Sequence, residues 1–161
     1  MEPRTIVRFY DASRDFDALR ACIIEQQDFH RGVEASWPEG KAIVDAYVKY
    51  LDIQCGTHDG CIMVADREGE LVGFGCVVAS TQGESPDDPS TFAWLHDIFV
   101  KAEYRRRGIA TLLIAGAEAF ARAHGARILR LGVLAENESA RSLYRKSGFR
   151  DYVRVLTKSL V

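Results

Sequence analysis

The stretch AWLHDIFVKAEYRRRGIAT, residues 93–111, decides the fold. Its first half is rich in large and β-branched residues and predicts a strand over residues 94–100. A polar turn, three arginines and Gly108 follow, and an apolar helical pattern begins at Ile109. A helix N-terminus offers free N–H groups and partial positive charge, and a glycine there lets an anion reach the backbone. This order of elements therefore predicts a phosphate site.

Each part of this stretch also has a simpler interpretation. Three consecutive arginines, Arg105, Arg106 and Arg107, are typical of a solvated surface patch or a small nucleic-acid contact. The glycine motifs of nucleoside triphosphate and dinucleotide sites do not fit, because neither Gly-Lys-Ser/Thr nor the further glycines are present. The net charge of −2 and pI of about 6.1 argue against a dedicated nucleic-acid binder.

Length and composition predict an ordinary globular protein. The 161 residues, 47% hydrophobic and 27% charged, suit one domain over residues 1–161. We find no apolar run of membrane-spanning length and no export signal. The four cysteines form no CxxC pair. We therefore expect a reduced, cytoplasmic protein that binds no structural metal, nucleic acid or membrane.

The N-terminal half predicts two helices between short strands. The expected elements are a strand over 5–10, helices over 14–29 and 37–56, and strands over 61–65 and 71–79 joined by a turn with Gly69. The connection after the first helix carries His30 and Glu34. These side chains could contact a substrate, but we favour the interpretation that they are solvated loop residues. The polar loop over 81–90 holds three acidic residues, which favour a cationic substrate or are simply solvated.

The C-terminal half predicts a parallel crossover. The pattern gives a helix from Ile109 to Gly125, a strand over 128–133, a helix over 137–148 and a last strand over 151–160 beside the previous one. A strand, helix and strand with short links imply parallel pairing. The arginine turn then lies at the carboxyl end of a strand, where open α/β sheets bind ligands.

Two motifs in this half resemble the GNAT superfamily of acetyl-CoA-dependent N-acetyltransferases. Arg105-x-x-Gly108-x-Ala110 is similar to the family's pyrophosphate loop, and the segment from Asn137 to Phe149 is similar to its second motif. The resemblance covers the chain from about Gly60 to the C-terminus. It implies a mixed α+β fold whose splayed central sheet has about six or seven strands and about four flanking helices.

The resemblance also gives roles to individual residues. Acetyl-CoA is the implied cosubstrate, with no metal, and family members often form homodimers. Backbone groups of the central strand and of the turn would hold the coenzyme, with help from arginine side chains or with these facing solvent, and with the side chains of Asn137 and Tyr144. The residues are Ile98, Phe99, Val100, Arg105, Arg106, Arg107, Gly108, Ile109, Ala110, Thr111, Asn137 and Tyr144. A strand N–H near Ile98 would stabilise the oxyanion as it forms.

The implied reaction needs a base and an acid. A primary amine has a pKa near 10.4, so its proton must be removed before it attacks the thioester. Asp97, directly or through water, is our first candidate for the base, and His96 is the alternative; as strand neighbours we expect them on opposite faces. Some relatives carry two acidic residues at this pair, so the role is open. Tyr144 is the candidate acid for the departing thiolate, or else a core aromatic residue.

Two functions from different classes follow from these residues. The first is acetyl transfer to a small-molecule or peptide amine, with a small cationic amine favoured by the acidic loop. The second is a non-catalytic acyl-CoA sensor or interaction module, against which Tyr144 and the His96-Asp97 pair argue.

Overall fold

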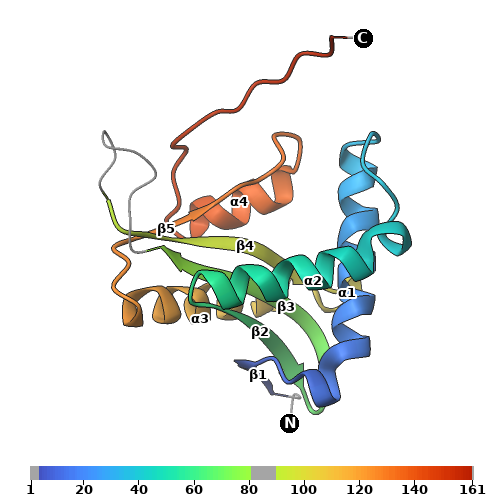
Figure 1. Cartoon of the computed structure of the whole chain (residues 1–161), viewed down its shortest axis with the longest axis vertical. Coiled ribbons are helices and arrows are strands. Elements are labelled where there is room, and N and C mark those ends of the chain that lie inside the picture. The colour runs from blue at the N-terminus through green and yellow to red at the C-terminus, as the bar shows by residue number, and fades with distance from the viewer. Residues whose placement is uncertain (1–3, 81–89, 161) are drawn as a thin grey trace.

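The structure, a computed structural model, describes residues 4–80 and 90–160 and contains one open sheet flanked by helices (Figure 1). The strands stand in the order β1-β2-β3-β4-β5, all antiparallel except the parallel pair β4 and β5. The elements are β1 (Thr5–Phe9), α1 (Ala12–Val33), α2 (Gly40–Thr57), β2 (Gly60–Arg67), β3 (Glu70–Ser80), β4 (Phe92–Val100), α3 (Ile109–Ala123), β5 (Ile128–Leu131) and α4 (Glu138–Lys146), with a 3₁₀ turn over Ala102–Tyr104.

This architecture confirms the expected mixed α+β fold and the parallel crossover through α3. The sheet has five strands within the described residues, fewer than expected. The predicted last strand over residues 151–160 is wrong, because this segment has no strand assignment and is exposed along its length. The chain leaves the body of the protein beyond α4 instead of returning to the sheet (Figure 1). β5 is also shorter than predicted and ends at Leu131.

The two N-terminal helices begin and end differently from the prediction. Asp11 caps α1 by accepting a hydrogen bond from the Ser13 N–H, as its sequence suggests. α1 continues through His30 to Val33, so the connection to α2 is shorter than expected. The His30 ring packs edge-on against Trp37 at 5.6 Å, and Glu34 accepts a hydrogen bond from Ser36. Both side chains therefore have local partners at the end of α1.

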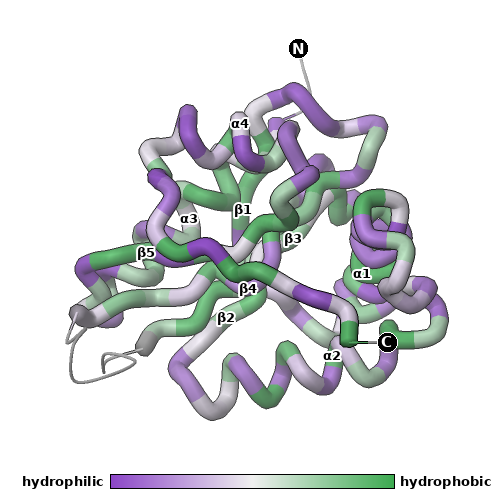
Figure 2. The backbone as a smooth tube through the Cα atoms, turned by 90° about the horizontal axis from the view of Figure 1, so that it is seen from above, coloured by the Kyte–Doolittle hydropathy of each residue, from purple (hydrophilic) through white to green (hydrophobic). Residues whose placement is uncertain are grey.

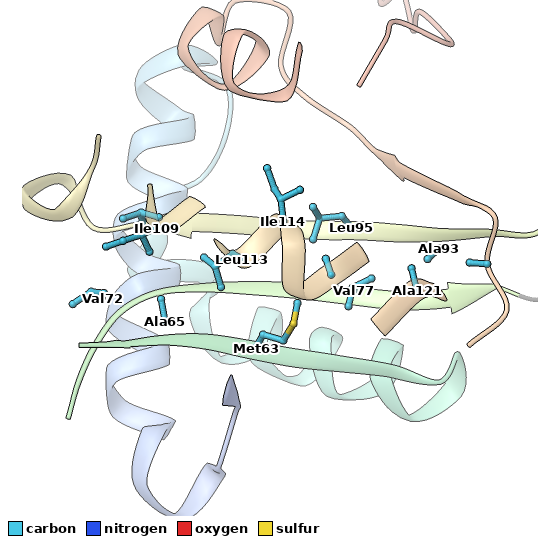
Figure 3. Close-up of a cluster of buried hydrophobic side chains, with 13 residues drawn as sticks. Met63, Ala65, Val72, Val77, Ala93, Leu95, Ile109, Leu113, Ile114 and Ala121 are labelled. Carbon is cyan, nitrogen blue, oxygen red and sulfur yellow. The ribbon is translucent and has the colours of Figure 1, made fainter. Parts of the chain in front are cut away.

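Two hydrophobic clusters cover the two faces of the sheet. One lies between the sheet and α3 and includes Met63, Val77, Leu95, Leu113 and Ile114 (Figure 3). The other lies between the sheet and the helices α1 and α2. The central strands are correspondingly hydrophobic along most of their length (Figure 2). A sheet buried on both faces explains why β3 and β4 read as nearly continuous apolar runs.

Glycines shape the hairpin and the close approach of β3 to β4. Glu68 and Gly69 both have positive φ, 55° and 93°, which confirms the predicted turn with Gly69 between β2 and β3. Gly73 lies opposite Val100, and a β-carbon there would come within 2.5 Å of the Phe99 carbonyl oxygen. The register shifts after Cys76, which pairs with Asp97 while Val77 pairs with Leu95. His96 is therefore an extra residue, a β-bulge in β4.

We expect Gly73→Ala to destabilise the protein by about 1–3 kcal/mol, because the new methyl group must push β3 and β4 apart. Gly132→Ala is the matched control, since a β-carbon at Gly132 has nothing within 4 Å. Chemical denaturation followed by tryptophan fluorescence measures both unfolding free energies. Equal effects of the two substitutions would contradict the close contact at Gly73.

Candidate functional site

The bulge in β4 turns His96 and Asp97 toward the same helix. The Tyr47 hydroxyl of α2 lies 2.9 and 3.0 Å from the two carboxylate oxygens of Asp97. The Tyr50 hydroxyl, one helical turn later, lies 3.5 Å from His96 Nδ1. The expectation that these neighbours point to opposite faces is therefore wrong, because a bulge interrupts the alternation of a regular strand.

Asp97 is a buried carboxylate held by two helices. Besides the Tyr47 hydroxyl, the Gln26 amide of α1 donates a hydrogen bond of 3.0 Å to its Oδ1. Burial raises the pKa of Asp97 to about 6, and the hydrogen bonds from Tyr47 and Gln26 oppose that rise. A carboxylate with this pKa is mostly ionised at neutral pH and accepts a proton more readily than an exposed aspartate does.

No catalytic motif in the sequence singles out Gln26 or Tyr47. Gln26 follows Leu19, Cys22 and Ile23 on the buried face of α1, so a polar residue in an apolar stripe was the available signal. Tyr47 lies among the apolar residues Val44, Val48 and Leu51 of α2, and only the tertiary structure shows its hydroxyl at a carboxylate.

His96 lies in a row of aromatic rings beside Asp97. Its ring centroid is 6.1 Å from that of Tyr50 and 6.3 Å from that of Trp94. Burial lowers the pKa of His96, with a smaller contribution from His58, so the neutral imidazole is favoured. Tyr47 and Tyr50 continue the row, with centroids 5.7 Å apart.

Tyr144 lies on the face of α4 that packs against the α3 side of the sheet. Its ring meets Phe149 edge-on at 5.8 Å. Burial, followed by the negative charge of Asp97, raises the pKa of Tyr144 to about 12. The phenol therefore keeps its proton at neutral pH.

The turn before α3 has open backbone geometry. Arg106 and Gly108 have positive φ, 60° and 77°, and α3 begins at Ile109 without a side-chain cap or an acidic residue in its first turn. The first N–H groups of a helix have no partner within the helix. In this turn they belong to Ile109, Ala110 and Thr111 and lie just beyond the carboxyl end of β4. The turn can thus accept an anion without displacing a carboxylate.

The arginines of this turn differ in what they contact. The Arg105 Nε donates a hydrogen bond of 2.9 Å to the Val100 carbonyl. Its guanidinium carbon lies 5.0 and 5.6 Å from the rings of Phe29 and Phe99. The guanidinium of Arg107 lies 5.7 Å from the Tyr104 ring, and Arg106 is exposed. The Arg105 side chain thus fastens the strand end to α1.

β5 pairs with only the first half of β4. Their ladder runs from Phe92 opposite Ile128 to Leu95 opposite Leu131, and it ends there among the described residues. The remaining part of β4, Ile98–Val100, stays paired with β3 on its other edge. The sheet therefore splays open beside Ile98–Val100, as the resemblance implies, and an extended ligand can bond to the strand there.

Asn137 stands at the start of α4. Its Oδ1 accepts hydrogen bonds of 3.2 Å from the Ala140 N–H and the Ser139 hydroxyl. This explains the helix start that the sequence predicts, since asparagine is a preferred N-cap. The side-chain N–H₂ group brings two further donors to this position.

Within residues 4–80 and 90–160, no three His, Cys, Asp or Glu side chains come together as a metal site would require. No helix described there is long and apolar enough to cross a membrane. The acidic residues Glu84, Asp87 and Asp88 lie outside the described residues.

Comparison with known proteins agrees with this geometry. The model of the acetyltransferase (GNAT) family matches residues 24–149. An uncharacterized N-acetyltransferase of Methanocaldococcus jannaschii is 33% identical over 122 residues, 76% of this chain and 52% of that protein. The uncharacterized N-acetyltransferase YycN of Bacillus subtilis is 36% identical over 94 residues, 58% of this chain and 57% of that protein. The matched region thus spans little more than half of either relative.

A solved structure shares the fold. The aminoglycoside N-acetyltransferase AAC(6')-Iy, in complex with CoA, superposes with a TM-score of 0.73, covering 99% of this chain and 96% of that one. The sequence identity is 19%, so this likeness concerns the fold alone.

Proposed function

This chain belongs to the acetyltransferase (GNAT) family, and we propose that it transfers an acetyl group from acetyl-CoA to a primary amine. The family match confirms the resemblance carried by the two sequence motifs. Acetyl-CoA as the donor, the amine as the acceptor and the residue roles below are the proposal.

The opening of the sheet beside Ile98–Val100 carries this proposal. It lies next to the Gly108 turn, so one ligand can pair with the strand and reach the helix N-terminus. Coenzyme A has this form, an extended amide-containing arm joined to a pyrophosphate. The N–H groups of Ile109, Ala110 and Thr111 would bind the pyrophosphate, with charge from Arg106 and Arg107. Arg105 would contribute through its backbone, and Asn137 would donate to the arm.

Asp97 and Tyr144 would move the protons. The amine nitrogen attacks the thioester carbonyl carbon, and the carbon–sulfur bond breaks. Asp97, directly or through water, takes the proton that the ammonium group loses, while Gln26 and Tyr47 hold the carboxylate in place. Tyr144 gives its proton to the departing sulfur. A backbone N–H near Ile98 would stabilise the oxyanion.

The aromatic row beside Asp97 supports a cationic acceptor. Rings of Tyr47, Tyr50, Trp94 and His96 follow one another next to a buried carboxylate. Aromatic faces and a negative charge both attract an ammonium group. The AAC(6')-Iy complex with a CoA–acetylneamine bisubstrate analogue shows that this fold accommodates an amine linked to coenzyme A. We therefore expect a small amine with at least one positive charge.

Calorimetry with coenzyme A, followed by an amine panel with acetyl-CoA, tests this function. The panel contains polyamines, aminoglycosides, amino acids and lysine-containing peptides, and thiol release and acetylated product are both measured. We expect coenzyme A binding and turnover of at least one cationic small amine. Binding without turnover of any amine would favour the sensor instead, and no binding would contradict both functions.

We expect Gly108→Ala to raise the KM for acetyl-CoA about tenfold with little change in kcat. A β-carbon is strained at the Gly108 φ of 77° and stands where the anion approaches. Gly125→Ala is the matched control, because Gly125 has a φ of 79° and equally open surroundings but lies at the far end of α3. Steady-state kinetics should show the KM increase only for Gly108→Ala; a similar increase for both would refute the anion role.

A further inference from the structure

Two thiols close to the candidate site face each other. The Sγ atoms of Cys55 on α2 and Cys76 on β3 lie 3.8 Å apart, and both residues are free cysteines. Cys76 is buried, whereas Cys55 is only half-buried, so a small molecule can reach the pair from the Cys55 side. A disulfide needs its two sulfurs about 2 Å apart, so a small approach would join these thiols.

Packed secondary structure positions the pair. A β-carbon at Gly60 would come within 2.9 Å of both the Cys55 Cα and the Val77 carbonyl oxygen. The lack of a side chain at Gly60 therefore lets the end of α2 lie directly against β2 and β3. Cys76 belongs to the hydrophobic cluster between the sheet and the helices α1 and α2, and Cys55 packs against that cluster. The two sulfurs are thus held close by a helix and a strand.

Cys55 is the thiol of this chain that loses its proton most readily. A hydrogen bond with Cys76 lowers the pKa of Cys55, although burial opposes this shift. Burial raises the pKa of Cys22 and of Cys61 to about 12, and the hydrogen bond with Cys55, followed by burial, raises the pKa of Cys76. Peroxides oxidise the thiolate and not the thiol. A reachable, more acidic thiol that touches a second thiol is typical of a peroxide-sensitive site.

The pair also connects the two elements that flank the candidate base. Cys76 is the partner of Asp97 in the register of β3 and β4, at the last pair before the bulge. Cys55 follows Tyr47 by two turns of α2, and both side chains pack against the same cluster. The Tyr47 hydroxyl in turn donates to the Asp97 carboxylate. A bond between the thiols would therefore join the helix that holds Asp97 to the strand that pairs with it.

We propose that peroxide oxidises Cys55, which then forms a reversible disulfide with Cys76 that lowers the turnover of the enzyme. The Cys55 thiolate attacks one peroxide oxygen, the O–O bond breaks, and the departing hydroxide takes up the proton that Cys55 released. The product is a sulfenic acid at Cys55. The Cys76 sulfur then bonds to the Cys55 sulfur, and the sulfenic oxygen leaves as water with the Cys76 proton. Two thiols lose two electrons in total, and the peroxide is reduced to two waters.

We expect the disulfide to lower kcat at least about tenfold. The two sulfurs must approach by about 2 Å, which displaces the end of α2 relative to the strands. Tyr47 would then move relative to Asp97, to which its hydroxyl now bonds at 2.9 and 3.0 Å. A displacement of about 1 Å in a catalytic arrangement costs up to about 100-fold in rate. This effect rests on the proposed acetyl transfer, whereas formation of the bond does not.

Peptide mass spectrometry after oxidation tests the bond. The full chain is treated with a small molar excess of hydrogen peroxide, and the remaining thiols are alkylated. We expect the peptides with Cys55 and Cys76 to be joined, and dithiothreitol to separate them. Cys55→Ala should form no link. Cys61→Ala is the matched control, because Cys61 is also a half-buried free thiol, and this variant should form the link at the wild-type rate. Circular dichroism checks that both variants keep their fold.

Turnover of the best amine of the panel is followed on the same samples. The wild-type kcat should fall as the link forms and recover with dithiothreitol, and peroxide should leave the kcat of Cys55→Ala unchanged. No link between Cys55 and Cys76, a link through Cys61, or a linked protein with an unchanged kcat would each overturn the proposal. The link is detected from peptide masses alone, so a protein that forms it but acetylates no amine would contradict the proposed function and not the bond.

Discussion

Tyr144→Phe should lower kcat by about 100-fold or more, while the affinity for acetyl-CoA changes less than about threefold. In the proposed mechanism the Tyr144 phenol gives its proton to the leaving sulfur, and its pKa of about 12 keeps it protonated at neutral pH. A thiol has a pKa near 8.5, so this phenol is a weaker acid than the thiol that it forms, and the breaking of the carbon–sulfur bond has to drive the proton transfer. Phenylalanine keeps the ring contact with Phe149 and lacks only the hydroxyl group.

Single-turnover kinetics and calorimetry separate the two quantities. Acetyl-CoA binding is measured by calorimetry without an amine, and kcat is measured with the best amine of the panel. Tyr10→Phe provides the control, because it removes a phenol that packs against the other hydrophobic cluster. The acid role fails if Tyr144→Phe keeps the wild-type kcat, or if its whole effect is a weaker affinity for acetyl-CoA.

The features that the sequence predicted well depend on neighbours along the chain. The strand, turn and helix around Gly108 form one continuous stretch, and the positive φ of Gly108 agrees with the need for glycine there. Gly69, Gly125 and Gly148 also have positive φ at the turn and helix ends where they were expected. Each of these signals acts over a few residues, so the printed sequence contains it in full.

The features that the sequence did not predict depend on packing between distant segments. The bulge at His96 arises from the register of β4 against β3, and a shift of one residue reverses the face of a side chain. Gln26 and Tyr47 contact Asp97 from positions 71 and 50 residues away in the sequence. The spacing rules for helices and strands predict contacts only between residues a few positions apart. The strand predicted over residues 151–160 does not form, because a strand needs a neighbouring strand to pair with and a local pattern does not supply one.

Asp97→Asn should abolish most activity and at the same time stabilise the fold. As the base, Asp97 must be ionised, so the rate of the wild type should fall as the pH drops through about 6. Asparagine cannot take a proton, so we expect kcat/KM to fall by about 100-fold to 1,000-fold. The acidic limb of the pH–rate profile, which is the fall in rate below about pH 6, should then be absent. His96→Gln is the matched control and should keep the limb. Loss of the limb in His96→Gln alone would make His96 the base.

The stability effect follows from the same buried charge. An unfolded aspartate has a pKa near 3.9, whereas Asp97 in the folded protein has a pKa of about 6. Between these values the folded state binds more protons, so the wild type loses stability as the pH rises, by about 3 kcal/mol at most. Asparagine keeps an acceptor for Gln26 and Tyr47 but carries no charge.

Unfolding free energies of the wild type and of Asp97→Asn, measured from pH 4 to pH 8, test this directly. The two proteins should be about equally stable near pH 4, and the variant should be more stable above pH 7. A variant that is less stable at pH 8 would show that the carboxylate holds the helices α1 and α2 to β4 at no electrostatic cost. The ionised carboxylate would then have a structural role, in holding the helices to the strand. A carboxylate kept for proton transfer is instead expected to reduce stability when it is ionised.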